Sequence, residues 1–423
     1  MARLALIVGL VIVAAPGAAR GQPVEVTVDE LVTRALTDNS DLRAARAEVE
    51  AATARVAQAA LRPNPMLELG GQKAISPDNN LMIGVTVPLD LNGRKEGRVG
   101  VAEREVAVKR ALLAERERRL RADIRLKAGE LLAARRNLTV ADQLLQVNRD
   151  ALGLVRRRFA EGAAPALEEN LSLVEVNRLD ASRHLLASRL QIAAFALKAL
   201  AGLRPETFLE LRGDLVTPPP VPAAGAAVQQ SLASRPDLRA ARAEVAAAQA
   251  RVRKEQAEGR WDASVNVGYQ RQDTGFMLRG LTDSGATRPI QDVFHYFGGG
   301  ISIMLPVRNR NEGNIAAARA ETVAAERRLE FMELMARQEI DAAFAQYDAA
   351  RRSLALYEPG VREVARRNLD VVRQAYQLGR GSLLDVIAEQ RRYIEIENGY
   401  TDVLKQVYEA AVEIERAVAG TSR

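Results

Sequence analysis

Four short segments of the chain predict β-strands, at 66–71, 81–89, 262–270 and 296–305. In the clearest of them, apolar and polar residues alternate with a period of two, which is typical of a strand with one apolar face. A short loop separates the first two segments, whereas the polar residues 271–293 between the last two predict a long loop. The pattern therefore indicates two β-hairpins, of which the second has the longer loop.

Long segments rich in Ala, Leu, Arg and Glu, with few prolines, make up most of the remaining chain. These residue types favour a helix. They predict six helices, at 29–61, 97–158, 167–201, 226–257, 313–377 and 383–419. We expect Asp29 to cap the first helix, the RPNP segment to end it, and Pro359-Gly360 to kink the fifth.

The helix expected over 97–158 is longer than an ordinary globular domain allows. At 1.5 Å per residue it would extend for roughly 90 Å. A helix of this length needs partner helices along its side, as in a coiled coil. The half-length helices 167–201 and 226–257 would stack end to end beside it. The expected fold class is therefore mainly α, with long antiparallel coiled-coil helices and a small β part.

An internal duplication organises the chain. Three pairs of segments match in order, namely 41–59 with 237–255, 84–105 with 300–321, and 159–169 with 376–386. The first pair is identical at 14 of 19 positions, and the offset rises from 196 to 216 across the hairpin. The second hairpin is therefore about 20 residues longer, while the helical arms keep equal length. The resulting domains are a first repeat at 22–202, a Pro-rich linker at 203–225 and a second repeat at 226–423.

Residues 1–21 have the pattern of a signal peptide, with Arg3 before an apolar run at 4–13 and small residues after it. Cleavage after Ala19 or after Gly21 fits the pattern. No later stretch reaches about 18 apolar residues, so membrane insertion would have to use strands. Four strands cannot close a barrel in lipid, whereas three copies would pool twelve.

Composition narrows the possible functions. The formal charge is +6, but both signs are interleaved along the predicted helices, which does not favour nucleic-acid binding. Cysteine is absent, and the two histidines, His184 and His295, are far apart in sequence. No HExxH, P-loop or GxSxG motif is present. We therefore expect neither an enzyme nor a cofactor or metal site.

Three segments carry a resemblance to a known family. They are RPNP (62–65) after the first helix, LPVRNRNEGNIAAARAE (305–321) after the fourth strand and YQLGRGSLLDV (376–386) at the last turn. In this order, and together with the duplication, they resemble the TolC family of outer-membrane efflux factors over the whole mature chain. The RPNP and NRN-x-G segments are most similar to its heavy-metal-efflux branch.

The resemblance implies a homotrimer with a 12-stranded transmembrane β-barrel in outer-membrane lipid and a helical tunnel in the periplasm. It also implies a periplasmic adaptor (membrane fusion) protein that docks at the tunnel tip. An inner-membrane RND-type transporter would supply energy and select the substrate. The chain would then be the passive exit duct of a tripartite efflux pump, with heavy-metal cations as its expected cargo.

The resemblance further implies which residues act at the tip. Asp385 matches an acidic position that narrows the tunnel entrance, and Glu168 is its counterpart in the first repeat. The family's second acidic position falls at Ala388, beside Glu389, so this chain departs from a double acidic ring. The alternative role for Asp385 is to face the positive end of a helix dipole. The residues expected to form the tip turns or contact the adaptor are Gly162, Gly379, Arg380, Gly381, Ser382 and Leu383.

Two other functions are compatible with the sequence. The same channel could serve multidrug efflux or type I protein secretion, because specificity would reside in the inner-membrane partner. A periplasmic coiled-coil scaffold without a pore belongs to a different class. The substrate distinguishes the first alternative, and conductance in a lipid bilayer distinguishes the second.

Overall fold

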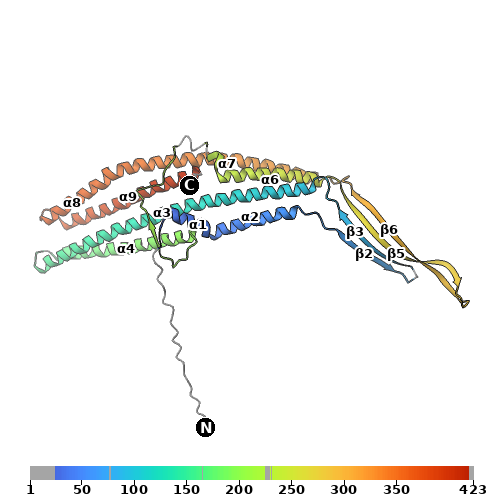
Figure 1. Ribbon diagram of the computed structural model, residues 1–423. Coiled ribbons are helices and arrows are strands. Elements are labelled where there is room, and N and C mark those ends of the chain that lie inside the picture. Colours follow the sequence, from blue (N-terminus) through green and yellow to red (C-terminus); the bar gives the residue numbers. More distant parts are fainter. Residues whose placement is uncertain (1–23, 76–77, 164, 224–228, 230, 419–423) are drawn as a thin grey trace, which may run out of the picture. The chain divides into compact units, whose positions relative to one another are not determined.

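The computed structural model describes residues 24–75, 78–163, 165–223, 229 and 231–418 (Figure 1). The predicted signal peptide, residues 1–21, lies outside this described part. The chain divides into two compact units. Within the described residues, unit 1 combines the segment that ends at Asn39 with Leu120–Pro220 and Gln346–Val412, and unit 2 combines Ser40–Arg119, the segment that ends at Ala345 and the segment that begins at Glu413.

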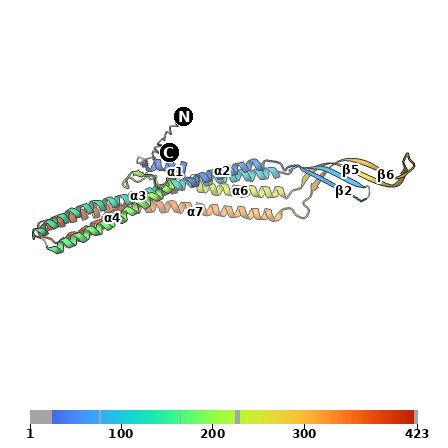
Figure 2. The ribbon, with the colours of Figure 1, turned by 90° about the horizontal axis from the view of Figure 1, so that it is seen from below.

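Two helical hairpins form most of unit 1. In the first, the C-terminal part of α3 (Arg94–Ala160) turns back into α4 (Ala166–Leu200). In the second, α8 (Glu363–Gln377) turns back into α9 (Leu383–Val418). Figures 1 and 2 both show α3 and α4 side by side, and Figure 1 shows α8 and α9 joined at their turn. These bounds confirm the helices predicted at 97–158, 167–201 and 383–419 to within a few residues.

An apolar cluster joins α3, α4 and α9 within unit 1. Its members are Leu145, Leu152, Val176 and Leu179, with Leu173 and Ile394 packed against them. The spacing of seven residues between Leu145 and Leu152, and of three between Val176 and Leu179, places them on one face of each helix. The long helices of unit 1 are therefore held by a packed seam, as the coiled-coil prediction requires.

Unit 2 contains four neighbouring helices. They are α2 (Ser40–Ala59), the N-terminal part of α3, α6 (Pro236–Glu258) and most of α7 (Glu312–Leu356). Ion pairs join neighbours in this order: Lys109–Glu48 at 2.9 Å, Arg251–Glu105 at 3.8 Å and Arg242–Glu333 at 3.0 Å. Most of the buried side chains of α6 are alanines, and such small side chains let the backbones of adjacent helices approach closely. The alanine-rich composition is thus used for helix packing.

A four-stranded antiparallel sheet completes unit 2, in the order β2-β3-β5-β6. Its strands are β2 (Met66–Lys73), β3 (Asn79–Pro88), β5 (Asp262–Leu281) and β6 (Thr287–Met304). Figure 1 shows them as one continuous ribbon of strands. The internal duplication therefore places both hairpins in a single sheet, joined through the β3–β5 pairing. The outermost strands, β2 and β6, leave their outer edges unpaired among the residues that the structure describes.

The prediction of a long loop over 271–293 is wrong. Strands β5 and β6 continue through most of it and pair as far as Leu281 with Thr287. The 20 extra residues of the second copy thus lengthen the strands, to 20 and 18 residues against 8 and 10 in the first hairpin. The sequence pattern did not predict these strands because the segment is polar and lacks an alternating apolar face. Pairing between the two strands stabilises them without such a face.

The prediction of a single helix over 29–61 is also wrong, because the helix is interrupted at Asn39 and continues as α2. α1 (Val28–Asp38) ends there, where Asn39 takes an extended conformation and its side chain donates to the Leu200 carbonyl at 2.9 Å. The helix also begins earlier than predicted. Thr27, and not Asp29, is the N-cap, and it forms a capping box with Glu30.

The linker predicted over 203–225 contains a strand that the sequence did not reveal. β4 (Leu209–Arg212) pairs in parallel with β1 (Val24–Thr27) within unit 1. Arg135 of α3 donates to the carbonyls of Leu211 and Gly213, at 2.8 and 2.7 Å. Four-residue strands carry too short a pattern for periodicity to detect.

Two predicted helix boundaries change for physical reasons. The helix predicted from 226 is interrupted at Arg235, after which α6 begins with Pro236 at its first position. Its predicted first residues, 226–228 and 230, lie outside the described residues. The kink predicted at Pro359-Gly360 is a π-helical turn, η1 (Tyr357–Arg362), between α7 and α8. Proline lacks the N–H that an α-helical turn needs, and the wider turn accommodates this loss.

Candidate functional site

The first tip turn joins α3 to α4. Gly162 adopts a φ of 72°, in the left-handed region that favours glycine. The Ala163 N–H donates to the Arg158 carbonyl at 2.7 Å and closes the end of α3. α4 then begins after Pro165, which provides no side-chain cap, and its first turn contains Glu168 and Glu169. Acidic residues at this end stabilise the helix dipole.

The second tip turn joins α8 to α9 with the same ending. Gly379 has a φ of 73°, and the Arg380 N–H donates to the Ala375 carbonyl at 2.8 Å. Gly381 is not in the left-handed region. A Cβ there would lie 3.4 Å from the backbone nitrogen of Tyr376, which is an ordinary contact distance, so neither the backbone nor the space requires glycine at this position. The repeated turn geometry reflects the duplication detected in the sequence.

Asp385 caps the start of α9. Its carboxylate accepts from the Ser382 hydroxyl at 2.7 Å and from the Ser382 N–H at 3.2 Å, while its own N–H donates back to the Ser382 hydroxyl. The hydrogen bonds from Ser382 hold the pKa of Asp385 below its ordinary value. The side chain is nevertheless exposed. The capping role is therefore present, and it leaves an ionised carboxylate facing solvent.

Glu168 has a different partner. It accepts a hydrogen bond at 2.9 Å from the hydroxyl of Tyr376, on α8. Burial of the Tyr376 phenol and this contact with Glu168 raise its pKa. The contact links the two helical hairpins close to their turns. Glu168 and Asp385 thus do not share a partner, although they are counterparts in the duplication.

The other predicted tip residues lie at the surface. Gly162, Gly379, Arg380, Gly381 and Ser382 are exposed, and Leu383 is half-buried. No hydrogen bond or ion pair engages the Arg380 side chain within the described part of the chain. These positions are accessible in the single chain, and adaptor contact by them remains a prediction.

A buried carboxylate on α4 was missed by the sequence reasoning. Glu175 is only 1% exposed. Its carboxylate accepts from Arg178 at 2.6 Å and from Arg391 of α9 at 2.9 Å. Burial by itself would raise the pKa of Glu175, but the hydrogen bonds and charges of the two arginines outweigh it and lower the pKa. Its spacing from Ser172 and Leu179, three and four residues away, places it on the buried stripe, which was an available signal.

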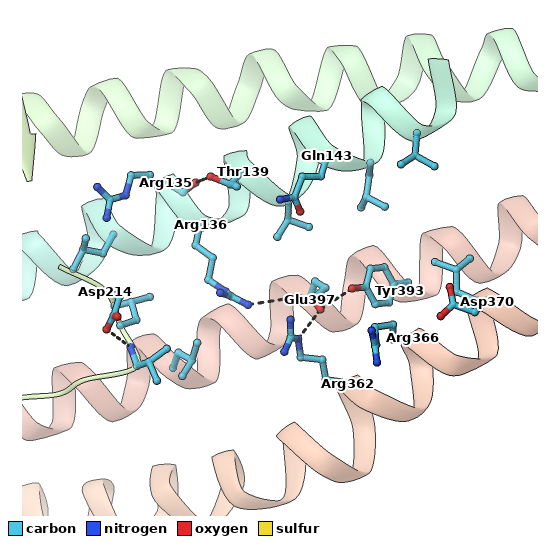
Figure 3. Close-up of a pocket in the computed structure, with 18 of the residues that line it drawn as sticks. Arg135, Arg136, Thr139, Gln143, Asp214, Arg362, Arg366, Asp370, Tyr393 and Glu397 are labelled. Carbon is cyan, nitrogen blue, oxygen red and sulfur yellow. Dashed lines mark hydrogen bonds and ion pairs between the residues drawn. The ribbon is translucent and has the colours of Figure 1, made fainter. Parts of the chain in front are cut away.

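A second buried carboxylate, Glu397 of α9, lies at the π-helical turn (Figure 3). Its oxygens accept from Arg362 at 2.6 Å, from Tyr393 at 2.9 Å and from Arg136 of α3 at 3.4 Å. The guanidinium groups of Arg136 and Arg362 also lie over the ring of Tyr400, at 5.1 and 4.8 Å from its centre, respectively. One carboxylate therefore connects α3, η1 and α9 within unit 1.

Beside Glu397 is a cavity of about 520 Å³, shown in Figure 3. Its charged lining residues are Arg135, Arg136, Asp214, Arg362, Arg366, Asp370, Arg373 and Glu397. Burial lowers the pKa of Arg373. Because cationic side chains outnumber anionic ones, the wall does not suit a cation.

No metal-ligating cluster occurs among the described residues. His184 is exposed on α4, and the His295 ring lies 2.7 Å from the Tyr269 hydroxyl across β5 and β6. Within the same part of the chain, none of the helices combines the length and apolarity needed to cross a bilayer. The polar groups found here hold helices together or cap them, and no set of them forms a nucleophile with an adjacent base.

Comparisons with known proteins agree on one family. The profile of the family described as outer membrane efflux protein matches residues 31–203 and 227–420. The cobalt-zinc-cadmium resistance protein CzcC of Cupriavidus metallidurans is 25% identical over 390 residues, which is 92% of this chain and 89% of that protein.

Solved structures share the fold. A membrane protein from Pseudomonas aeruginosa is similar with a TM-score of 0.76 at 22% identity, covering 92% of each chain. The transmembrane channel protein CusC gives 0.73 at 18% identity, covering 92% of this chain and 91% of that one. The outer membrane protein VceC of Vibrio cholerae gives 0.71 at 20%, covering 93% and 96%. The resemblance stated from the sequence motifs is confirmed.

Proposed function

The chain belongs to the outer membrane efflux protein family, and on that premise we propose that three copies form the exit duct of a tripartite pump that exports heavy-metal cations. Members of this family are efflux channels of the outer membrane, with a periplasmic helical part, and are not enzymes. The trimer, the tripartite pump and the metal cargo are the proposed refinements.

The open edges of the sheet support assembly. β2 and β6 have no partner on their outer sides within the described chain, and unpaired backbone groups are too costly to leave in hydrocarbon. Pairing β6 of one copy with β2 of the next satisfies both edges. Three copies close a ring of twelve strands, an even number in the range of bacterial outer-membrane proteins. This unfinished sheet is the observation that carries the proposed trimer.

The acidic tip supports a cationic cargo. Asp385 is exposed, and its lowered pKa keeps it ionised at neutral pH. In a trimer, three such carboxylates around a narrow opening attract cations and repel one another. We assign the gate to Asp385 and Glu168. Glu168 acts through Tyr376, whose hydrogen bond ties one hairpin to the other near the turns.

The proposed heavy-metal cargo is supported by one similar protein. The relative CzcC is a cobalt-zinc-cadmium resistance protein, and it is aligned over nearly the whole chain. We propose that energy and substrate choice come from an inner-membrane RND-type transporter. A periplasmic adaptor protein would connect that transporter to the tip turns, where Arg380, Ser382 and Leu383 offer accessible side chains.

Growth of a deletion strain in metal salts tests the cargo. Loss of the gene is expected to reduce tolerance to cobalt, zinc and cadmium, and a plasmid copy is expected to restore it. Efflux of an organic dye is the control and should not change. Impaired dye efflux with normal metal tolerance would favour the multidrug alternative, and loss of a secreted protein would favour type I secretion.

A further inference from the structure

A cavity of about 650 Å³ lies in unit 2, where the strands meet the helices. The segment after β6 forms much of it, and the end of α6 forms the facing side. Its lining residues are Arg94, Glu258, Arg260, Met304, Leu305, Pro306, Val307, Arg308, Asn309 and Asn311. We call it the junction cavity. No function proposed above uses it.

One wall of the junction cavity is apolar and solvent-facing. Met304, Leu305 and Val307 are 63%, 67% and 73% exposed. Trp261, the residue just before β5, is 43% exposed, and its neighbour Asp262 pairs with Met304 in the sheet. Three large apolar side chains within four residues thus expose hydrocarbon to water, and covering them is favourable in proportion to the apolar area removed from water. The wall therefore suits a ligand that carries hydrocarbon.

The other wall is basic, and its acidic residues are already neutralised. Arg94 forms ion pairs with both Glu258 and Asp262, each at 3.3 Å. Among the described residues, the Arg260 guanidinium donates only to the Asn92 carbonyl, at 3.4 Å, and Arg308 is exposed. Neither Arg260 nor Arg308 forms an ion pair with any described residue. Two guanidinium groups at the junction thus lack a counter-charge.

A buried donor points to the same conclusion. The Nε of Arg94 is buried and has no hydrogen-bond partner in the described part of the chain. A buried donor without an acceptor is costly, so such groups are usually satisfied by a bound molecule or water. An acceptor-only ligand beside Arg94 would remove this cost.

We propose that the junction cavity binds a membrane phospholipid, with its phosphate held by Arg260 and Arg308 and its glycerol and acyl chain against Leu305 and Val307. Arginine recognises phosphate oxygens through two parallel N–H donors, which an isolated lysine cannot do. A free phosphate would leave the apolar wall in water. Both walls are satisfied only by an anionic headgroup joined to hydrocarbon.

The location fits the ends of the strands. β6 ends at Met304 and β5 begins at Asp262, so the cavity lies where the sheet leaves the bilayer on its helical side. Lipid phosphates are at that depth in a membrane, just outside the hydrocarbon. The inference rests on the proposed function in one respect, because it requires the sheet to span the membrane. The lipid would belong to the periplasm-facing leaflet.

Native mass spectrometry of the full-length protein with added phosphatidylglycerol tests the proposal. The wild type is expected to retain lipid, and the double variant Arg260→Gln/Arg308→Gln to bind it at least tenfold more weakly. Arg319→Gln is the matched control, because Arg319 is an exposed arginine of α7 outside the cavity. Leu305→Gln should also weaken lipid binding, since it removes part of the apolar wall.

Equal lipid retention by the double variant and the wild type would overturn the proposal. It would also fail if inorganic phosphate at a comparable concentration displaced the lipid completely, because the site would then recognise an anion alone. The same spectra report the number of copies in each complex. A trimer without bound lipid contradicts only this inference, whereas a monomer contradicts the proposed function.

Discussion

At the residue scale, three carboxylates of unit 1 differ in whether their charge is neutralised by arginines or exposed to solvent. Glu175 and Glu397 are almost fully buried, at 1% and 2% exposure, and arginines neutralise them. Asp385 is exposed and bonds only to Ser382. Its charge is therefore available to solvent ions. This contrast is why the gate is assigned to the tip and the buried pairs are assigned to helix packing.

Substitutions can separate the charge of Asp385 from its capping bonds. Asp385→Asn removes the charge but keeps an oxygen that accepts from Ser382, so we expect weaker block of the channel by multivalent cations. Ser382→Ala keeps the charge and removes a capping hydroxyl, so it should lower the melting temperature and leave the block intact. Block in planar bilayers and thermal unfolding measure the two effects. Unchanged block in Asp385→Asn would leave Asp385 with the capping role alone.

The pH dependence of cation block can be predicted from the pKa of Asp385. Hydrogen bonds from Ser382 lower the pKa of Asp385, so the carboxylate stays ionised at every pH above the ordinary aspartate value of about 3.9. Cation block should persist down to that pH and weaken only below it. A block that weakened between pH 7 and pH 5 would show either that repulsion among the three carboxylates raises the pKa of Asp385 or that a different group carries the block.

Glu175 provides a stability prediction. Glu175→Gln keeps the shape of the side chain but removes the charge that Arg178 and Arg391 share. Both arginines are about half exposed and can regain water, so the expected loss is about 2 kcal/mol of unfolding free energy. Denaturant unfolding measures it. Glu169→Gln, at an exposed pair with Arg156, is the control and should change stability by less than about 1 kcal/mol.

At the element scale, long helices and their turns could be predicted because their signals extend over many residues. Most ends of the long helices fall within a few residues of the prediction. The break at Asn39 and the β1–β4 pairing depend on contacts distant in sequence, such as Asn39 with Leu200. The extension of β5 and β6 through a polar segment depends on pairing between strands. The pattern of residues along a short segment cannot indicate contacts with residues far away in the sequence.

The candidate site was only partly predictable for the same reason. The motif YQLGRGSLLDV identified Asp385 and both turn glycines, because turn chemistry is local. The partner of Glu168 is 208 residues away, at Tyr376. The buried roles of Glu175 and Glu397 likewise require a second helix. Sequence therefore indicated the tip, and the structure added the groups that join its helices.

The π-helical turn gives a further prediction at this scale. Gly399 of α9 faces Tyr357 of η1, and a Cβ at Gly399 would overlap the Tyr357 hydroxyl. Tyr357 also stacks on Tyr400, with ring centres 6.4 Å apart. Gly399→Ala should therefore destabilise unit 1 by about 1–3 kcal/mol. Thermal unfolding checks this expectation.

A second substitution serves as the control for that clash. Tyr357→Phe removes the hydroxyl that the new methyl group would meet. The double variant Gly399→Ala/Tyr357→Phe should recover part of the stability lost in the single variant. Additive losses in the double variant would show that Gly399 is needed for another reason, such as backbone flexibility.

At the scale of the whole molecule, the chain is incomplete as a membrane protein. Within the described residues, its sheet has two open edges. A membrane form with satisfied backbone groups therefore requires other copies. A periplasmic scaffold would keep the helices but would have no use for a closed sheet.

Single-channel recording in planar lipid bilayers tests the central claim most directly. Purified full-length protein, with its trimeric state verified by mass, is expected to insert and give discrete conductance steps. Multivalent cations on the side of the tip turns should reduce those steps. Protein that remains trimeric and folded but yields no conductance in repeated trials would contradict the channel and favour the scaffold.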